Sequence, residues 1–198
     1  MINTTRLRCT VGWLGMLLPW LVVLLLGMFP SSISATYYTA EAVAPFMIIL
    51  GSASFLLFSY KGYETIDDIV NSLAGLFGLL ICLFPCATNE LELVGTFQIN
   101  SNISGWIHNI SAFGFFGLLS YNSLFLFTKG SDNPTKNKKI RNVIYRICGV
   151  GMISSFLILL LPYFYIQVWL IETIALFFFG ISWLTKADYY PWLFADKK

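Results

Sequence analysis

Six long apolar stretches, separated by short polar segments, recur along the chain. Each approaches the roughly 20 mostly apolar residues that a helix needs to cross a bilayer. The pattern therefore predicts an all-α polytopic membrane protein, in which residues 1–198 form a single bundle of six transmembrane helices. The predicted spans cover residues 11–29, 42–60, 69–85, 105–128, 143–161 and 167–185.

The basic residues give these spans a direction. With six spans, all twelve Lys and Arg residues fall in the N-terminal segment, the second loop, the fourth loop with the start of the fifth span, or the C-terminal segment. The loops at residues 30–41 and 86–104 have no Lys or Arg. Because cytoplasmic loops carry an excess of these residues, we expect both termini to be cytoplasmic. In a bacterium, the chain would lie in the cytoplasmic (inner) membrane.

An alternative interpretation treats residues 1–35 as a secretory signal that is cleaved. Two arginines precede an apolar run, and small residues follow it, as in such signals. The apolar run is longer than the 7–15 residues that are usual for a signal, and cleavage would leave five spans. We therefore favour a first transmembrane helix.

Composition agrees with a membrane protein and limits its chemistry. The chain is 57% hydrophobic and 11% charged, whereas soluble domains have about 25% charged residues. A soluble protein of this size would need more charged residues on its surface. We therefore expect lipid to cover much of the surface of this chain. A single histidine and four cysteines without a CxxC pair exclude a multi-histidine metal or haem centre. We expect no metal, no other cofactor and no nucleic-acid partner.

Polar residues gather at the predicted outer ends of the spans. Ser32, Ser34, Tyr37 and Tyr38 follow the first span, His108 and Ser111 lie at the start of the fourth, and Glu172 lies about one turn into the sixth. An ionisable residue inside a membrane span marks a functional site by default, and His108 is the obvious partner for Glu172.

Three hypotheses are open for this cluster. In the first, Ser32 or Ser34 is a nucleophile, His108 its base and Glu172 the group that orients the base. We select Ser34 as the nucleophile, with Ser32, Tyr37, Tyr38 and Ser111 lining the pocket. In the second, the acid and the histidine form a protonatable pair in a substrate or proton path. In the third, they form a buried hydrogen-bonded pair that joins the fourth and sixth helices.

A second polar cluster lies on the predicted cytoplasmic side. Asp67 and Asp68 share this side with Arg141 and Arg146, which predicts an ion-pair network. The segment beginning at Thr65 has the pattern of a capping box, with Thr65 as the cap and Asp68 at the third helical position. The basic segment at residues 129–142 serves either as a topology determinant or as a site for anionic lipid headgroups.

Three short motifs carry a resemblance to a known group of families. Phe29-Pro-Ser-Ser-Ile-Ser34 follows the first span, Leu83-Phe-Pro85 ends the third and Ile107-His108 opens the fourth. This arrangement resembles the FRAG/DRAM/Sfk-type six-helix membrane proteins and related bacterial families. The resemblance implies a role for Ser32, Ser34, Pro85 and His108 in a lipid-linked or regulatory function.

These observations together predict a lipid-associated membrane protein with a polar pocket on its outer side. If the cluster is catalytic, it would make the protein a lipid hydrolase or an acyltransferase; in either case we expect its partners to be membrane lipids. The alternatives are a small proton-coupled transporter and a non-catalytic scaffold or regulatory protein.

Overall fold

The computed structural model describes residues 4–130, 134–159 and 167–189. Its long elements are six α-helices: α1 (Thr4–Leu26), α2 (Val43–Phe58), α3 (Thr65–Leu83), α4 (Ser101–Tyr121), α5 (Lys136–Leu159) and α6 (Val168–Lys186). Its short elements are the 3-10 helix η1 (Ser34–Tyr38), the π-helix η2 (Asn122–Leu126) and the strands β1 (Leu93–Val94) and β2 (Ile99–Asn100).

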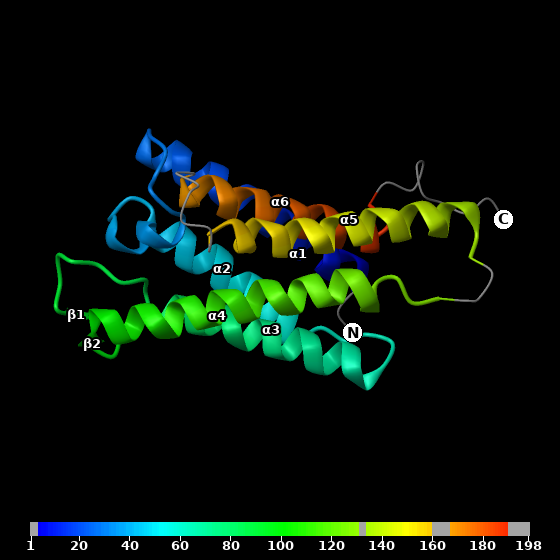
Figure 1. The fold of residues 1–198 in the computed structure, drawn as a ribbon, viewed down its shortest axis with the longest axis horizontal. Helices are drawn as coiled ribbons and strands as arrows, with labels where there is room; N and C mark the ends of the chain where they lie inside the picture. Colours follow the sequence, from blue (N-terminus) through cyan, green and yellow to red (C-terminus); the bar gives the residue numbers. More distant parts are fainter. Residues whose placement is uncertain (1–3, 131–133, 160–166, 190–198) are drawn as a thin grey trace.

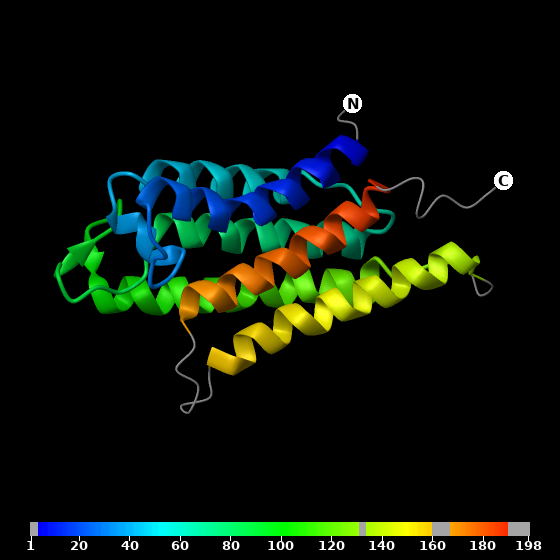
Figure 2. The ribbon, with the colours of Figure 1, turned by 90° about the horizontal axis from the view of Figure 1, so that it is seen from above.

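The six helices alternate in direction and form one bundle (Figures 1 and 2). Each helix packs against its neighbour in the sequence, and α1 also packs against α6, so the contacts close into a ring. η1 and the β1–β2 hairpin lie at one end of the bundle, and the α2–α3 and α4–α5 connections lie at the other (Figure 1). The chain thus returns to the same end after every second helix.

The predicted all-α fold is confirmed, and each predicted span overlaps one helix. Within the described residues, three helices, α1, α3 and α6, are long and apolar enough to cross a membrane, and α2 is a shorter apolar helix. Several boundaries differ from the prediction: α1 begins at Thr4 rather than residue 11, and α5 begins at Lys136 rather than residue 143. Polar residues at a helix end can continue the backbone hydrogen bonding beyond the apolar stretch that predicts the span.

Close helix packing depends on small residues, as expected where lipid gives helices no hydrophobic drive to associate. A Cβ added at Gly75 of α3 would lie 2.5 Å from the carbonyl oxygen of Ser54 in α2. A Cβ at Gly12 of α1 would lie 3.1 Å from the carbonyl oxygen of Gly180 in α6. Both distances are shorter than normal van der Waals contact, so a larger residue at Gly75 would force the backbones apart, and one at Gly12 would require a small shift.

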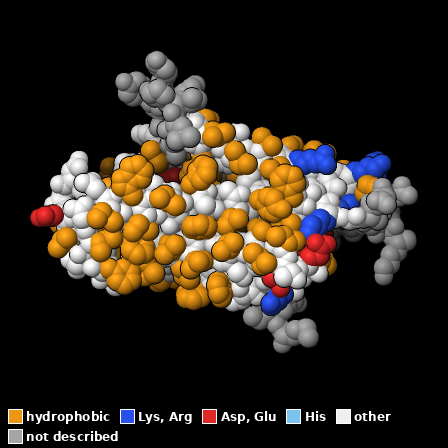
Figure 3. All heavy atoms as spheres, turned by 60° about the horizontal axis from the view of Figure 1, so that its bottom comes forward, with side chains coloured by type: hydrophobic (Ala, Val, Ile, Leu, Met, Phe, Trp, Pro, Cys, Tyr) orange, Lys and Arg blue, Asp and Glu red, His pale blue; other side chains and the backbone are white. Residues whose placement is uncertain are grey.

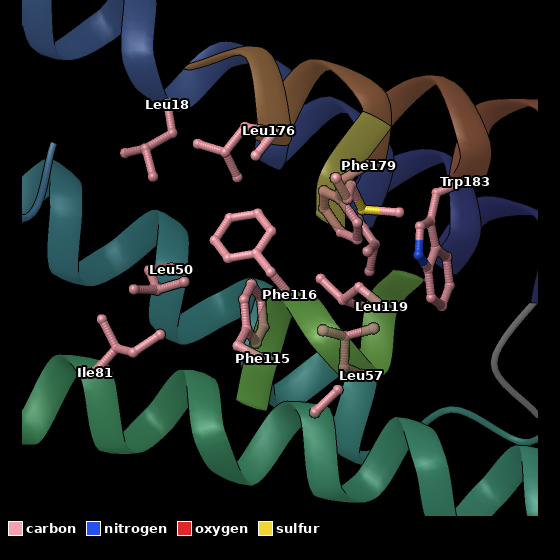
Figure 4. Close-up of a cluster of buried hydrophobic side chains, with 14 of the residues drawn as sticks. Leu18, Leu50, Leu57, Ile81, Phe115, Phe116, Leu119, Leu176, Phe179 and Trp183 are labelled. Carbon is pink, nitrogen blue, oxygen red and sulfur yellow. The ribbon is translucent and has the colours of Figure 1, made fainter. Parts of the chain in front are cut away.

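The core fills the inside of the ring. Phe179 and Trp183 of α6 pack against Phe115 and Leu119 of α4, and Leu57 of α2 lies beside them (Figure 4). On the surface, hydrophobic side chains cover the middle of the face drawn in Figure 3, and Lys and Arg side chains lie at one end. On this face, an apolar middle with the bases at one end is the pattern that a bilayer-embedded bundle requires.

Candidate functional site

A stiff polar segment joins α1 to α2 at the end of the bundle opposite the basic residues. The Ser32 hydroxyl accepts a hydrogen bond from the Ala35 amide at 2.9 Å, and the Thr36 hydroxyl donates to the Ile33 carbonyl at 2.6 Å. Ser and Thr side chains commonly bond to nearby backbone in this way and stabilise turns. These bonds hold η1 in shape and fix the position of Ser34 at its start.

Glu172 of α6 holds this segment from the other side. Its Oε2 accepts a hydrogen bond from the Ile33 amide, and its Oε1 accepts from the Ser34 hydroxyl at 3.3 Å. The Trp169 amide, one turn earlier, donates to the carbonyl of Ser31 at 3.0 Å. The start of α6 is therefore tied to the segment by its backbone and by a carboxylate.

His108 of α4 also contacts Ser34. Its Nε2 lies 3.0 Å from Ser34 Oγ, its Nδ1 lies 2.8 Å from the Phe84 carbonyl oxygen, and the side chain is 3% exposed. A carbonyl oxygen can only accept a hydrogen bond, so Nδ1 carries a proton. In the neutral ring, Nε2 then has a free lone pair that faces the Ser34 hydroxyl.

The structure brings Ser34, His108 and Glu172 together, in an order that differs from the predicted triad. Ser34 lies between the acid and the histidine, and the group that orients the imidazole is the carbonyl of Phe84 rather than Glu172. The sequence could not indicate this orienting group, because a backbone carbonyl has no residue signature.

A single proton links the three side chains. The Ser34 hydroxyl can donate to only one neighbour at a time. With Glu172 protonated, the acid donates to Ser34 Oγ and Ser34 donates to a neutral His108. With Glu172 ionised, Ser34 donates to the carboxylate and accepts from a protonated His108. The two arrangements that satisfy both contacts differ by one proton moved between the acid and the histidine.

A cavity of about 170 Å³ opens next to these residues, here called the Ser34 cavity. Its polar end is lined by Ser32, Ser34, Cys86, His108, Asn109 and Glu172. Its apolar end lies inside the bundle, where side chains from all six long helices line it; those of Leu18, Leu50, Ile81 and Leu176 are labelled in Figure 4. These apolar side chains include Leu18, Leu50, Ile81, Phe116, Phe156 and Leu176. The cavity thus has one hydrogen-bonding end and one hydrocarbon end.

Of the four predicted lining residues, the structure places only Ser32 at this cavity. Ser111 is buried inside the bundle, at 1% exposure. Tyr37 and Tyr38 stack edge to face beside the polar cluster, with ring centroids 5.3 Å apart. The Tyr38 hydroxyl donates to the Cys86 carbonyl at 2.6 Å, and burial raises the pKa of Tyr38 to about 12. Tyr38 is thus joined to a lining residue without lining the cavity itself.

Two polar lining residues, Asn109 and Cys86, were absent from the prediction. Asn109 follows His108 directly and brings a side-chain amide to the cavity. Cys86 follows the Phe-Pro motif, and burial, with Glu172 as a smaller cause, raises the pKa of its thiol to about 11. Their position directly after the Phe-Pro motif and after His108 is the only sequence feature that could have indicated them. Among the described residues, no group of three or more His, Cys, Asp or Glu is arranged to hold a metal ion.

At the opposite end of the bundle, Asp67 and Asp68 pair with lysines, whereas Arg141 and Arg146 were expected. Asp68 pairs with Lys61 at 3.2 Å, Asp67 with Lys129 at 3.3 Å, and Arg141 lies 4.0 Å from Asp188. Arg146 is exposed. The acids lie on α3, and α3 packs against α2 and α4 rather than α5, so bases in the adjoining loops reach them first.

The capping box of α3 also differs from the prediction by one residue. Glu64 is the N-cap, and Asp67 occupies the third helical position. The Asp67 carboxylate accepts hydrogen bonds from the amides of Tyr63 and Glu64, and Asp68 instead accepts from the Gly62 amide. Both acids therefore satisfy backbone donors before the helix as well as pairing with lysines.

No family model, curated protein or solved structure matches the chain. The resemblance to the FRAG/DRAM/Sfk-type six-helix proteins therefore stays a prediction.

Proposed function

We propose that this chain is a six-span membrane protein that transfers or hydrolyses the acyl group of a lipid, with Ser34 as the nucleophile. One observation carries the proposal: the Ser34 hydroxyl lies 3.0 Å from Nε2 of a buried histidine, at the mouth of a cavity whose other end is hydrocarbon. An ester-linked acyl chain has the same division into a polar group and an apolar tail.

The membrane placement rests on helix length and charge. At about 1.5 Å per residue, the 16-residue α2 extends about 24 Å and the longer helices exceed that. A hydrocarbon core is about 30 Å thick, so all six helices would cross it with modest local adjustment. The basic residues would lie in the cytoplasm, and the Ser34 cavity would open at the outer leaflet.

The proposed reaction follows from the contacts of Ser34. As Ser34 Oγ attacks the ester carbonyl, its proton moves to His108 Nε2, and the protonated ring then donates to the departing alkoxide. The hydrogen bond from Nδ1 to the Phe84 carbonyl keeps Nε2 directed at Ser34 throughout. Water or an acceptor hydroxyl then takes the acyl group from Ser34. The first route gives a hydrolase and the second an acyltransferase.

Two further lining residues suit this chemistry. The Ser32 hydroxyl proton and the Asn109 side-chain amide are hydrogen-bond donors at the same cavity. Donors directed at the carbonyl oxygen stabilise the negative charge that develops on it during attack. We assign them this role because the Ile33 amide, a third nearby donor, is already bonded to Glu172.

A non-catalytic role is the second candidate, because the same contacts join α4, α6 and the 31–38 segment. Glu172 and His108 would then act only to hold the outer end of the bundle together through Ser34. The two candidates predict the same structure and differ in the reactivity of the Ser34 hydroxyl.

An active-site probe separates the two. The protein, purified into lipid nanodiscs, is treated with a long-chain alkyl fluorophosphonate, and the modified residue is located by peptide mass spectrometry. We expect one adduct at Ser34, lost in Ser34→Ala and retained in Ser31→Ala, whose exposed hydroxyl lies in the same segment. His108→Gln, which keeps a polar side chain without a base of suitable pKa, should slow labelling by about 10²–10⁴-fold.

Thermal unfolding of each variant shows whether it folds. If Ser34 is unlabelled in the folded wild-type protein, or is labelled equally fast in folded His108→Gln, the acyl-transfer proposal is wrong. The scaffold role would then be the better explanation of the same contacts.

A further inference from the structure

A second cavity lies at the basic end of the bundle, far from Ser34 along the helices. It has a volume of about 400 Å³, within the roughly 300–1,000 Å³ range of small-molecule sites. Five cationic side chains line this cavity, which is called the basic cavity below: Arg8, Lys129, Lys138, Arg141 and Lys186. They come from α1, the connection between α4 and α5, α5 itself and the end of α6, so the fold brings them together from distant parts of the sequence.

The acids at this cavity balance only part of that charge. Glu64 and Asp188 are its acidic lining residues, and Asp67, outside the lining, lies 3.3 Å from Lys129, so five cations face three carboxylates among the described residues. Lys129 pairs with Glu64 at 2.6 Å, and Arg141 lies 4.0 Å from Asp188. Each acidic lining residue is therefore paired with one cation. The three other cations contribute positive charge that the described lining does not neutralise.

Neutral groups hold those three cations in position. Arg8 donates to the Tyr60 hydroxyl at 2.9 Å and to the Lys186 carbonyl at 3.3 Å. Lys138 donates to the Phe127 carbonyl at 2.9 Å. The Lys186 ammonium lies over the ring of Tyr63, 5.2 Å from its centroid. Tyrosine hydroxyls, carbonyls and ring faces orient a cation without cancelling its charge, so the cavity stays positive.

The direction of the pKa shift of Lys138 agrees with an excess of positive charge at the basic cavity. Lys138 lies before the apolar part of α5, and burial, followed by the charge of Arg141, lowers the pKa of its ammonium. Lys129 shows the opposite: its hydrogen bond to the Glu64 carboxylate raises the pKa of its ammonium. An anion in the cavity would stabilise the charged form of Lys138.

A topology determinant does not require this arrangement. The positive-inside rule needs bases on one side of the membrane and is indifferent to whether they meet. Lys136 and Lys139 satisfy the rule from exposed positions on the same turn of α5 as Lys138. Convergence of five cations on one cavity costs repulsion between like charges, which a bound anion would offset.

We propose that the basic cavity binds a phosphate group, carried either by an anionic phospholipid headgroup or by a soluble phosphate compound. Arg8 and Arg141 offer planar guanidinium groups that suit phosphate oxygens, and the lysines add point charges. In the six-span placement, the cavity lies at the level of the cytoplasmic headgroups, where anionic lipids concentrate. This site uses none of the residues at the Ser34 cavity.

Binding to purified protein in neutral detergent tests the proposal. Native mass spectrometry and thermal midpoints are compared for phosphatidic acid, phosphatidylcholine, inorganic phosphate and glycerol 3-phosphate. We expect a one-to-one complex and a raised midpoint with phosphatidic acid, and neither with phosphatidylcholine. Equal binding by the two water-soluble phosphates would identify a soluble phosphate as the ligand. Binding by the lipid alone would identify the headgroup.

Matched charge variants locate the site. Lys138→Gln and Lys186→Gln should each weaken binding about fivefold, since a basic side chain near an anionic headgroup contributes about that factor. Lys136→Gln and Lys139→Gln remove the same charge outside the cavity and should change binding less than twofold. Lys138→Arg keeps the charge and should retain binding, which separates loss of the site from loss of folding.

The proposal is wrong if none of the phosphate compounds binds better than phosphatidylcholine. It is also wrong if the exposed Lys136 and Lys139 variants weaken binding as much as the cavity variants do, because the effect would then be one of general surface charge. Neither result bears on the reactivity of Ser34, so the two proposals fail separately.

Discussion

Replacing Glu172 tests how the outer end of the bundle is held. Glu172→Ala removes the acceptors of the Ile33 amide and the Ser34 hydroxyl. Ile33 is 3% exposed, so its amide would lose its partner in a buried setting. An unsatisfied buried donor costs about 1–3 kcal/mol. Since 1.4 kcal/mol is a factor of ten, this cost corresponds to roughly 5- to 150-fold faster opening of the segment.

Glu172→Gln should behave differently. Its carbonyl oxygen can accept from the Ile33 amide, and its NH₂ group can donate to Ser34 Oγ, which then donates to His108 Nε2. This pattern copies the arrangement in which the acid is protonated. We therefore expect the glutamine variant to keep both the segment and the reactivity of Ser34 with a fluorophosphonate.

Amide hydrogen exchange, read by mass spectrometry in nanodiscs, measures the effect at peptides that contain Ile33. We expect roughly 5- to 150-fold faster exchange in Glu172→Ala and near wild-type exchange in Glu172→Gln. Glu41→Ala, an exposed acid on the same connection, is the control and should leave the rate unchanged. Unchanged exchange in Glu172→Ala, or equal acceleration in both Glu172 variants, would refute this account of the tether.

Three further predictions concern other parts of the molecule. Gly75→Ala places a Cβ 2.5 Å from an α2 backbone oxygen and should cost about 1–3 kcal/mol in detergent unfolding, whereas Gly51→Ala, with open space within 4 Å, should not destabilise. Asn122→Ala breaks the buried 2.6 Å bond to Asn71 and should cost about 0.6–1.7 kcal/mol in the same assay. Burial raises the pKa of Cys86 to about 11. In a variant that keeps only this cysteine, the rate of thiol alkylation should therefore rise about tenfold per pH unit from pH 7 to 10. A plateau of the rate near pH 8.5 would contradict this.

The sequence predicted the helices because their cause is local. An apolar run of about 20 residues signals a buried or membrane helix regardless of what surrounds it, and each of the six runs overlaps a helix of the structure. The predicted helix ends were less accurate. Helical hydrogen bonding extends through polar residues, such as those of Thr4–Thr10, that lie outside the apolar run.

The meeting of Ser34, His108 and Glu172 was also predictable, because alternating helix direction brings residues far apart in sequence to the same end of the bundle. The order of the three was not. Ser34 lies between the acid and the histidine, Glu172 also accepts from the Ile33 amide, and the Phe84 carbonyl orients the imidazole. Backbone donors and acceptors of this kind leave no pattern in side-chain identity.

Ion pairs at the basic end were the least predictable feature. Asp67 pairs with Lys129 and Asp68 with Lys61, although Arg141 was expected. Several bases share that end, and the choice among them depends on which helices are neighbours in the ring. The side of a membrane on which charged residues lie can be predicted from a sequence. Which of those residues pair depends on how the helices pack.

Cysteine labelling tests the membrane placement most directly. In a background that lacks the four native cysteines, single variants Glu90→Cys and Lys136→Cys place one thiol at each end of the bundle, both at exposed positions. A membrane-impermeant maleimide applied to intact cells should label the thiol at residue 90 at once and the thiol at residue 136 only after the cells are opened. Labelling of both thiols in intact cells, or of neither, would put the two ends in one compartment and contradict a bundle that crosses the bilayer.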